Sequence, residues 1–290
     1  MKQVFSAILL ASLAFGQTGN SGSGAASAPA IPVEQENAAK AKALLDQMIQ
    51  ALGGQAYLTF QDKSEEGRGY ALFHGESNST GTPFVRFTKF PDKERVEMIH
   101  LRAYHFLFFT VGNVAIKDKS DVVLIHDGDQ GWEITYKGTA AEPPADTAAY
   151  LRRRLHSLEW VLRKWLTEPG VALFYEGSTV AAQKEAERVT IMNSQNDAVT
   201  LYIDSSTHLP VKKSFSWRDP TDKQRNVEEE IFDHYRQVQG IMTPFDISRY
   251  YNGEMSAQRF LTAVAYNKGL NDSMFTAQVT YDPNKPAPKK

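Results

Sequence analysis

The sequence predicts an α+β fold with an antiparallel sheet, and three observations indicate it. Residues 199–253 contain four short runs with the alternating pattern of half-buried strands, separated by turn residues. Further strand-like runs lie on both sides of one central helical segment. Successive runs are joined by short turns, whereas parallel βαβ units need long helical connections. We therefore expect one domain in which a few helices pack on an antiparallel sheet.

The N-terminal segment has the pattern of an exported protein. Lys2 precedes an apolar run at residues 4–15, which ends in the small residues that a signal peptidase reads. This pattern predicts a signal peptide at residues 1–16, cleaved near the Gly16–Gln17 bond. The apolar run is too short to cross a bilayer. We therefore expect a periplasmic protein.

Two segments outside the expected domain have the composition of flexible chain. Residues 17–33 are rich in Gly, Ser and Ala, which favours a flexible leader. Residues 279–290 are rich in Pro and Lys, and we expect a disordered tail there. The domain itself is expected to span residues 34–278.

The first helix is expected at residues 34–52. Its apolar residues recur at helical spacing on one face, and charged residues occupy the other: Leu44, Leu45, Met48, Ile49 and Leu52 against Lys40, Lys42 and Asp46. Gly53 and Gly54 follow in the position of a glycine cap. The pattern predicts an amphipathic helix that packs with one face on the sheet.

Four strands and a hairpin are expected before the central helix. The strand-like runs are residues 69–74, 84–90, 94–99 and a very apolar run at 104–111. The hairpin covers residues 121–137, where Asp127, Gly128 and Gly131 supply the turn.

The central segment predicts one continuous helix that Asp146 or Thr147 caps. Its apolar stripe is Leu151, Leu155, Leu158, Leu162, Trp165 and Leu166. Pro169 and Gly170 end it. Arg152, Arg153 and Arg154 lie off this stripe, as a solvent-facing or partner-facing cluster.

The remaining strands follow the central helix. We expect them at residues 172–175 and 188–192, then at 199–203, 211–217, 229–238 and 241–251, and finally at 260–266. Residues 138–145, before the central helix, are expected to form a loop.

Composition and motifs argue against several function classes. The net charge of −2 gives no electrostatic support for a nucleic-acid partner. The seven histidines are scattered without a metal-ligand spacing, and no cysteine is present. No nucleophile elbow or phosphate-binding glycine loop occurs. The sequence thus predicts no catalytic residues, no metal and no cofactor.

Several motifs, taken in order, resemble a known family. They are ALGG at 51–54, HDGDQGWEI at 126–134, YEGSTVAAQKEAERVTI at 175–191, LYIDSSTHLPVK at 201–212 and FDHYRQVQGIMTPFDIS at 232–248. Their order is similar to that in the LolA-like, or outer-membrane-lipoprotein-sorting, superfamily. The resemblance implies a curved antiparallel sheet that forms an unclosed half-barrel, with helices packed on its concave face.

The same resemblance implies a function. A member of this family is expected to bind or carry lipid or lipoprotein acyl chains in a hydrophobic cavity, without catalysis. The aromatic content of 11% suits either such a cavity or a packed core. Candidate lining residues are Val123, Ile125, Trp132, Ile134, Leu201, Ile203, Phe215 and Trp217.

Two alternative functions stay open at this point. One is an envelope protein-interaction or sensor module with a vestigial cavity, in which the arginines at 152–154 meet an acidic partner. The other is a secreted hydrolase whose site is too dispersed to find in one sequence. Neither the identity of a ligand nor the donor and acceptor of a carried lipid follows from these residues.

Overall fold

The computed structural model describes residues 33–73, 76–77, 81–98, 116 and 118–283, and residues 33–290 group into one compact unit. The predicted signal peptide, most of the predicted leader and the predicted strand at 104–111 lie outside the described residues. Within the described part of the chain, no helix is long and apolar enough to cross a membrane.

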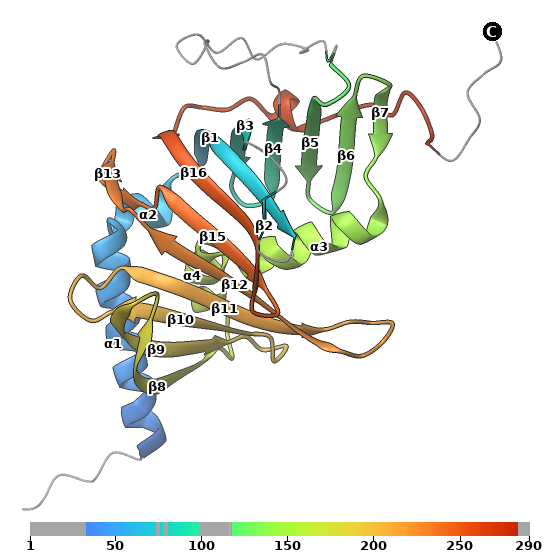
Figure 1. Cartoon of the computed structure of the whole chain (residues 1–290). Coiled ribbons are helices and arrows are strands. Elements are labelled where there is room, and N and C mark those ends of the chain that lie inside the picture. Colours follow the sequence, from blue (N-terminus) through green and yellow to red (C-terminus); the bar gives the residue numbers. More distant parts are fainter. Residues whose placement is uncertain (1–32, 74–75, 78–80, 99–115, 117, 284–290) are drawn as a thin grey trace, which may run out of the picture. The chain divides into compact units, whose positions relative to one another are not determined.

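Fourteen of the described strands form one antiparallel sheet (Figure 1). Their order is β7-β6-β5-β4-β3-β1-β16-β15-β12-β11-β10-β9-β8, and the short β2 pairs with β1. The edge strands β7 and β8 lie at opposite ends and do not pair, so the sheet is not closed. The predicted α+β fold with an unclosed, curved antiparallel sheet is confirmed.

The strands of the N-terminal half are β1 (Asp62–Phe73), β2 (Glu76–Ser77), β3 (Thr82–Lys89), β4 (Lys93–Met98), β5 (Val122–Asp127), β6 (Gln130–Thr135) and β7 (Gly138–Ala141). Those of the C-terminal half are β8 (Ala172–Ala181), β9 (Lys184–Met192), β10 (Ala198–Asp204), β11 (Pro210–Arg218), β12 (Arg225–Asp233), β15 (Asp246–Tyr251) and β16 (Glu254–Tyr266). The two halves join through the β1–β16 pair.

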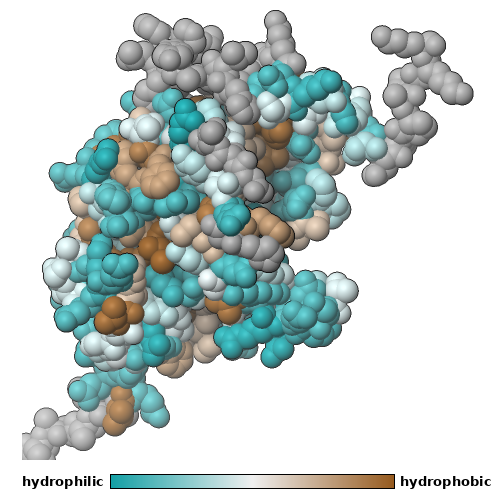
Figure 2. All heavy atoms as spheres, in the orientation of Figure 1, coloured by the Kyte–Doolittle hydropathy of each residue, from teal (hydrophilic) through white to brown (hydrophobic). Residues whose placement is uncertain are grey.

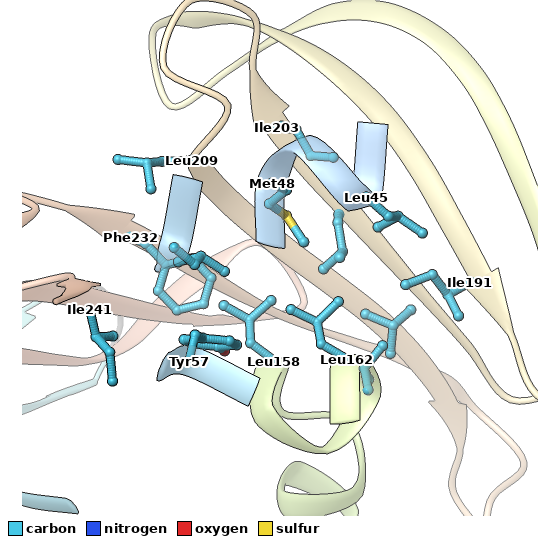
Figure 3. Packing of buried hydrophobic residues seen from close by; sticks show 14 of the residues in the cluster. Leu45, Met48, Tyr57, Leu158, Leu162, Ile191, Ile203, Leu209, Phe232 and Ile241 are labelled. Atoms are coloured by element: carbon cyan, nitrogen blue, oxygen red, sulfur yellow. The ribbon is translucent and has the colours of Figure 1, made fainter. Parts of the chain in front are cut away.

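The N-terminal helix agrees with its prediction. Helix α1 (Val33–Leu52) is followed by Gly53 and Gly54, both with positive φ, and then by the short α2 (Gln55–Thr59). One face of α1 is buried against β8 and β9 (Figure 1). Figure 3 shows Leu45 and Met48 of this face directed toward Ile191 and Ile203 of the sheet. This packing fills the β8–β12 end of the helix-covered face.

The central helix differs from its prediction because it is broken. It consists of α3 (Pro144–Leu155), α4 (Leu158–Arg163) and a 3-10 turn, η2 (Trp165–Thr167). The hydroxyl of Ser157 accepts the N–H of Trp160 at 3.2 Å and starts α4 as a new helix. The break turns Leu158 and Leu162 into the core and leaves Leu155 37% exposed.

The predicted start of the central helix is also wrong. Helix α3 begins at Pro144, with Pro143 at the N-cap, so neither Asp146 nor Thr147 caps it. Proline has no N–H to satisfy and its fixed φ suits the first turn. The hydroxyl of Thr147 instead donates to Glu142 at 2.8 Å.

Several strand boundaries correct the sequence prediction. β1 begins at Asp62 and β16 at Glu254, earlier than expected, and β7 lies inside the predicted loop. β12 ends at Asp233, and the hairpin of β13 (Arg236–Val238) and β14 (Ile241–Thr243) forms a separate two-stranded sheet. The early residues of β1 are polar on both faces, so they lack the alternation that marks a half-buried strand.

A second, smaller core covers the opposite face of the sheet. Leu270, Met274 and Phe275, the last two in η3 (Asp272–Phe275), pack on Phe87, Val123 and Ile125. The carboxylate of Asp62 accepts the backbone N–H groups of Lys268, Gly269 and Leu270 at 2.6, 2.9 and 3.1 Å. Thr280 and Tyr281, in the predicted tail, donate their N–H groups to the Thr139 carbonyl. The β3–β6 end of the sheet is thus covered on both sides.

Candidate ligand cavity

A cavity of about 860 Å³ lies on the helix-covered face of the sheet. Its walls come from β1, β3, β4, β5, β12, β15 and β16 on one side and from α3 and α4 on the other. Ligand pockets in proteins have volumes of about 300–1,000 Å³. The cavity is therefore large enough for a small molecule or for a folded acyl chain.

None of the eight predicted lining residues lines this cavity. Val123 and Ile125 are buried on the opposite face of the sheet, and Trp132 and Ile134 pack on the same cluster. Residues along a strand point alternately to the two faces, so the prediction selected the wrong face of β5 and β6. The neighbouring Leu124, His126 and Glu133 line the cavity instead.

The other four predicted residues lie on the helix-covered face but away from the cavity. Leu201 and Ile203 are fully buried in the main core, together with Phe215, which stacks on His156 with ring centroids 4.3 Å apart. Trp217 packs at the edge of this core, and the guanidinium of Arg152 lies 3.4 Å from its ring centroid. Contact of any of the eight residues with a ligand stays a prediction.

The apolar wall of the cavity comes from three neighbouring strands. Phe84 of β3, Val96 and Met98 of β4, and Val122 and Leu124 of β5 all face it. The pairs Val96–Leu124 and Met98–Val122 are directly opposite each other in the sheet, so they form a continuous patch. Four of the five are only half-buried, because no side chain of the described residues covers them fully. This wall offers apolar surface to a ligand.

A belt of charged side chains crosses the cavity floor beside this wall. Glu65 of β1 lies opposite Arg86 of β3, with the carboxylate 3.3 Å from the guanidinium and 2.9 Å from the ammonium of Lys63. Arg86 also binds Glu94 of β4. Burial would raise the pKa of Glu65, but the cations Lys63 and Arg86 outweigh burial and hold that pKa at about 2. Glu65 is therefore ionised at neutral pH. The cavity thus differs from the purely hydrophobic one that the family resemblance implies.

The belt continues into β11, β12 and β15. Lys213, which is 2% exposed, lies opposite Glu230 and binds it at 2.8 Å. Arg249 lies opposite Glu230 on the other side, at 3.5 Å. Burial opposes ionisation of Glu230, yet Lys213 and Arg249 hold its pKa well below the usual range. The Nε atom of Arg249 is buried and has no hydrogen-bond partner among the described residues.

At its other end the cavity contains a buried histidine. Nε2 of His126 is 2.9 Å from Glu142, which also accepts the hydroxyl of Thr147. The imidazole stacks on Tyr150 of α3, with ring centroids 3.5 Å apart. Within the described residues, no three His, Asp or Glu side chains are placed to hold a metal ion. Together with the charged belt and the apolar wall described above, the His126–Glu142 pair gives the cavity a polar floor beside an apolar wall.

Sequence reasoning missed the charged belt for a physical reason. Lys63, Glu65, Arg86 and Lys213 each look like ordinary solvent-facing strand residues, because alternation with apolar residues is the pattern of a sheet with one wet face. Their burial results from α3 and α4 lying over them. Directly opposed unlike charges on neighbouring strands would have been a usable signal, had the strand register been known.

Comparison with known proteins indicates the fold. No protein-family model and no curated protein sequence matches this chain. A DUF1329 family protein from Desulfovibrio piger has a similar structure, with a TM-score of 0.52 and 13% identity over 81% of this chain and 97% of that one. For a putative outer membrane lipoprotein-sorting protein domain from Vibrio parahaemolyticus, the TM-score is 0.49 and the identity 11%, over 81% of this chain and 97% of that one. For a LolA superfamily protein from Nitrosomonas europaea, the TM-score is 0.48 and the identity 12%, over 82% of this chain and 97% of that one.

The likeness to the DUF1329 family protein extends over most of both chains. At identities of 11–13% such a likeness concerns the fold. It names no ligand, because unrelated functions occur on one fold.

Proposed function

We propose that this chain is an exported, non-enzymatic protein that binds or carries an acyl-chain amphiphile in the cavity between its sheet and α3 and α4. The cavity of about 860 Å³ with its half-buried apolar wall is the observation that carries the proposal. Burial of an acyl chain contributes about 0.8 kcal/mol per methylene. The wall from Phe84 to Leu124 supplies a surface for such burial.

The exterior gives less support for a function in docking an apolar partner. On the face drawn in Figure 2, hydrophobic residues form separate patches between hydrophilic ones. The most exposed of the large apolar side chains, Val33, Phe73 and Val180, come from separate segments of the chain. Single exposed apolar residues are ordinary on a protein surface. An interior ligand therefore suits the molecule better than an apolar docking face.

The arginines at 152–154, a candidate site for an acidic protein partner, are used inside the molecule. Arg152 lies on Trp217 and 3.4 Å from Glu228. Arg154 donates to the carbonyls of Gly128 and Asp92 at 2.6 and 3.3 Å. Arg153 lines the cavity. Two of the three are therefore occupied in holding α3 on the sheet.

Two names among the similar structures agree with the proposal. One of these proteins is called a putative lipoprotein-sorting protein domain and another a LolA superfamily protein. These names describe those proteins, and they suggest a lipid or an acylated protein as the ligand to test first.

The experiment is mass spectrometry of an organic extract from protein purified without detergent, followed by titration with dodecanoate. The wild type is expected to release or take up about one amphiphile per chain. Leu124→Trp, which fills the apolar wall, is expected to reduce the bound amount several-fold. The matched control is Val180→Trp on the surface, where the native side chain is 72% exposed.

A wild type that is empty and takes up no amphiphile would overturn the proposal. Unchanged uptake by a folded Leu124→Trp variant would place the ligand elsewhere. Turnover of ester, glycoside or peptide substrates that is lost in His126→Ala would favour the hydrolase alternative, since His126 and Glu142 form the buried acid–base pair of the cavity.

A further inference from the structure

Strand register brings two arginines together on the cavity floor. Arg249 of β15 lies opposite Ala257 of β16, and Arg259 is two residues further along β16 on the same face. Such diagonal neighbours are about 7–8 Å apart at their Cα atoms, within reach of long side chains. Arg259 itself lies opposite Ile247 on one side and Gly69 on the other, and neither residue has a charge.

A third arginine reaches the same space from the helix. Arg153 lies in the last turn of α3, between Arg152 and Arg154. Arg152 binds Glu228 of the sheet and Arg154 donates to loop carbonyls, whereas the side chain of Arg153 lines the cavity. The three cations thus approach one region of the cavity from β15, β16 and α3.

These arginines have fewer carboxylate partners than their neighbours. In the described part of the chain, Arg153 and Arg259 make no hydrogen bond or ion pair. Arg249 has only Glu230, at 3.5 Å, and shares it with Lys213. By contrast, Arg86 binds both Glu65 and Glu94, and Lys63 binds Glu65 and Glu159. Positive charge is therefore in excess at this place.

The excess is local. Counted over all described lining residues, eight Lys and Arg side chains face seven Asp and Glu side chains, so the cavity as a whole is almost balanced. Most of the other cations have carboxylate partners, and Arg154 donates to carbonyls. Arg153 and Arg259 are left over because neither makes an ion pair among the described residues, although Glu65 and Glu230 act on Arg259 from a greater distance.

The electrostatics agree with this arrangement. Burial lowers the pKa of the Arg259 guanidinium, and the nearby Arg86 and Arg249 add to the lowering, which Glu65 and Glu230 oppose. Burial likewise lowers the pKa of Arg249; Glu230 opposes the lowering, while Arg153 adds to it. Arg249 and Arg259 are therefore destabilised as cations by burial and by neighbouring arginines, which a bound anion would relieve.

On these observations, and resting on the proposed function, we infer that Arg153, Arg249 and Arg259 form an anion subsite that takes the phosphate or carboxylate headgroup of an acyl amphiphile. Guanidinium groups present paired N–H donors that match both anions. The buried Nε of Arg249, which has no acceptor among the described residues, is one such donor.

The subsite adjoins the apolar wall. Gly69 lies opposite Arg259, and a Cβ at Gly69 would be 3.7 Å from the ring of Phe84, the first residue of that wall. Gly69, Phe84 and Arg259 all line the cavity. An amphiphile with its headgroup at Arg259 would extend its chain past Phe84 toward Met98 and Val122.

The test compares probes that share one chain and differ in headgroup. Dodecyl phosphate, dodecanoate, 1-dodecanol and inorganic phosphate are titrated into the full mature chain. The wild type is expected to bind the two anionic probes at least tenfold more tightly than the neutral alcohol. Arg259→Gln and Arg153→Gln are expected to reduce this preference to about twofold while affinity for 1-dodecanol stays within twofold.

Arg218→Gln is the matched control, because Arg218 is exposed at the end of β11 and does not line the cavity. It is expected to bind all probes as the wild type does. Thermal unfolding without ligand supplies a second readout: Arg259→Gln is expected to be at least as stable as the wild type, because a cation that burial destabilises is removed.

The outcomes separate this inference from the proposed function. Amphiphile binding without any preference for anions in the wild type would overturn the subsite and leave the carrier function standing. An anion preference that persists in folded Arg259→Gln and Arg153→Gln would also overturn it. Binding of none of the four probes would overturn both proposals. Inorganic phosphate bound as tightly as dodecyl phosphate would assign the arginines to a free anion and overturn the amphiphile as their ligand.

Discussion

At the residue scale, the molecule depends on buried charges that are paired across strands. Lys63, Glu65 and Arg86 lie beneath α4 and line the cavity, where water is partly excluded. Removing one partner of a buried pair leaves the other charge without compensation, which costs more than the pair contributes. The paired charges Lys63, Glu65 and Arg86 and the arginines of the proposed anion subsite therefore have different expected roles, in stability and in binding respectively.

We predict that Glu65→Gln destabilises the protein at pH 7 by on the order of 3 kcal/mol. Because the native pKa of Glu65 is about 2, below the value of 4.5 for a free glutamate, the carboxylate stabilises the fold above pH 4.5. That stabilisation is lost as the pH falls toward 2. Urea unfolding across this range is expected to show the difference from the wild type shrinking with acidification.

The neighbouring Glu66 supplies a control on the opposite face of β1. Burial raises its pKa, so its ionised form opposes folding, and Glu66→Gln is expected to be neutral or stabilising at pH 7. An equal loss of stability in the two variants would contradict the assigned role of the Glu65 pairs.

At the element scale, the sequence predicted elements well where one face is buried in a packed core. α1, β10 and the β5–β6 hairpin follow their apolar periodicity closely, since Leu45, Met48, Leu201 and Ile203 all reach the main core. The first residues of β1 were not predicted as a strand, because the charged Lys63 and Glu65 occupy the face that points into the cavity.

The break between α3 and α4 was also not predicted from the sequence. A leucine stripe at helical spacing continues across it, and only the hydrogen bond of Ser157 to Trp160 N–H ends the pattern. The same limit applies to the site. The choice between the two faces of β5 depended on which face the C-terminal segment covers, and Leu270 and Phe275 are more than 140 residues away in sequence.

The end of α1 allows a sharp prediction about a close approach. Gly53 has φ +126°, and a Cβ there would lie 2.5 Å from the Gly240 carbonyl oxygen. Gly128, in the β5–β6 turn, has φ +63°, and a Cβ there would have no other atom within 4 Å among the described residues. Gly128→Ala is expected to cost about 1–2 kcal/mol from backbone strain alone. Gly53→Ala is expected to cost clearly more in denaturant unfolding, and equal costs would show that the β13–β14 turn can move away.

At the scale of the whole described unit, the sheet separates one face that lines the cavity from another that the C-terminal segment covers. The helix-covered side contains the cavity, while the C-terminal segment seals the other side over Phe87, Val123 and Ile125. The pair that joins the halves, β1 with β16, links residues about 200 positions apart. Local periodicity carries no information about such a pairing, which explains why the sequence indicated an antiparallel sheet but not its strand order.

Asp62 tests whether the two sides are independent. Its carboxylate accepts three backbone N–H groups from Lys268 to Leu270, and it is 2% exposed. Asp62→Ala is expected to destabilise the protein by about 2–3 kcal/mol, because the buried N–H of Leu270 and two partly buried N–H groups lose their acceptor. Hydrogen exchange should quicken at Leu270 and through η3, where protection depends on this anchor.

Amphiphile binding measured on the same Asp62→Ala protein is expected to stay within twofold of the wild type, because the cavity lies across the sheet from the anchor. Asp272→Asn is the control: its carboxylate is 65% exposed and pairs only with Lys89 among the described residues, so little change in stability is expected. Loss of binding in the Asp62 variant, with the fold intact, would instead show that the C-terminal cover sets the geometry of β3–β5 and thereby the apolar wall.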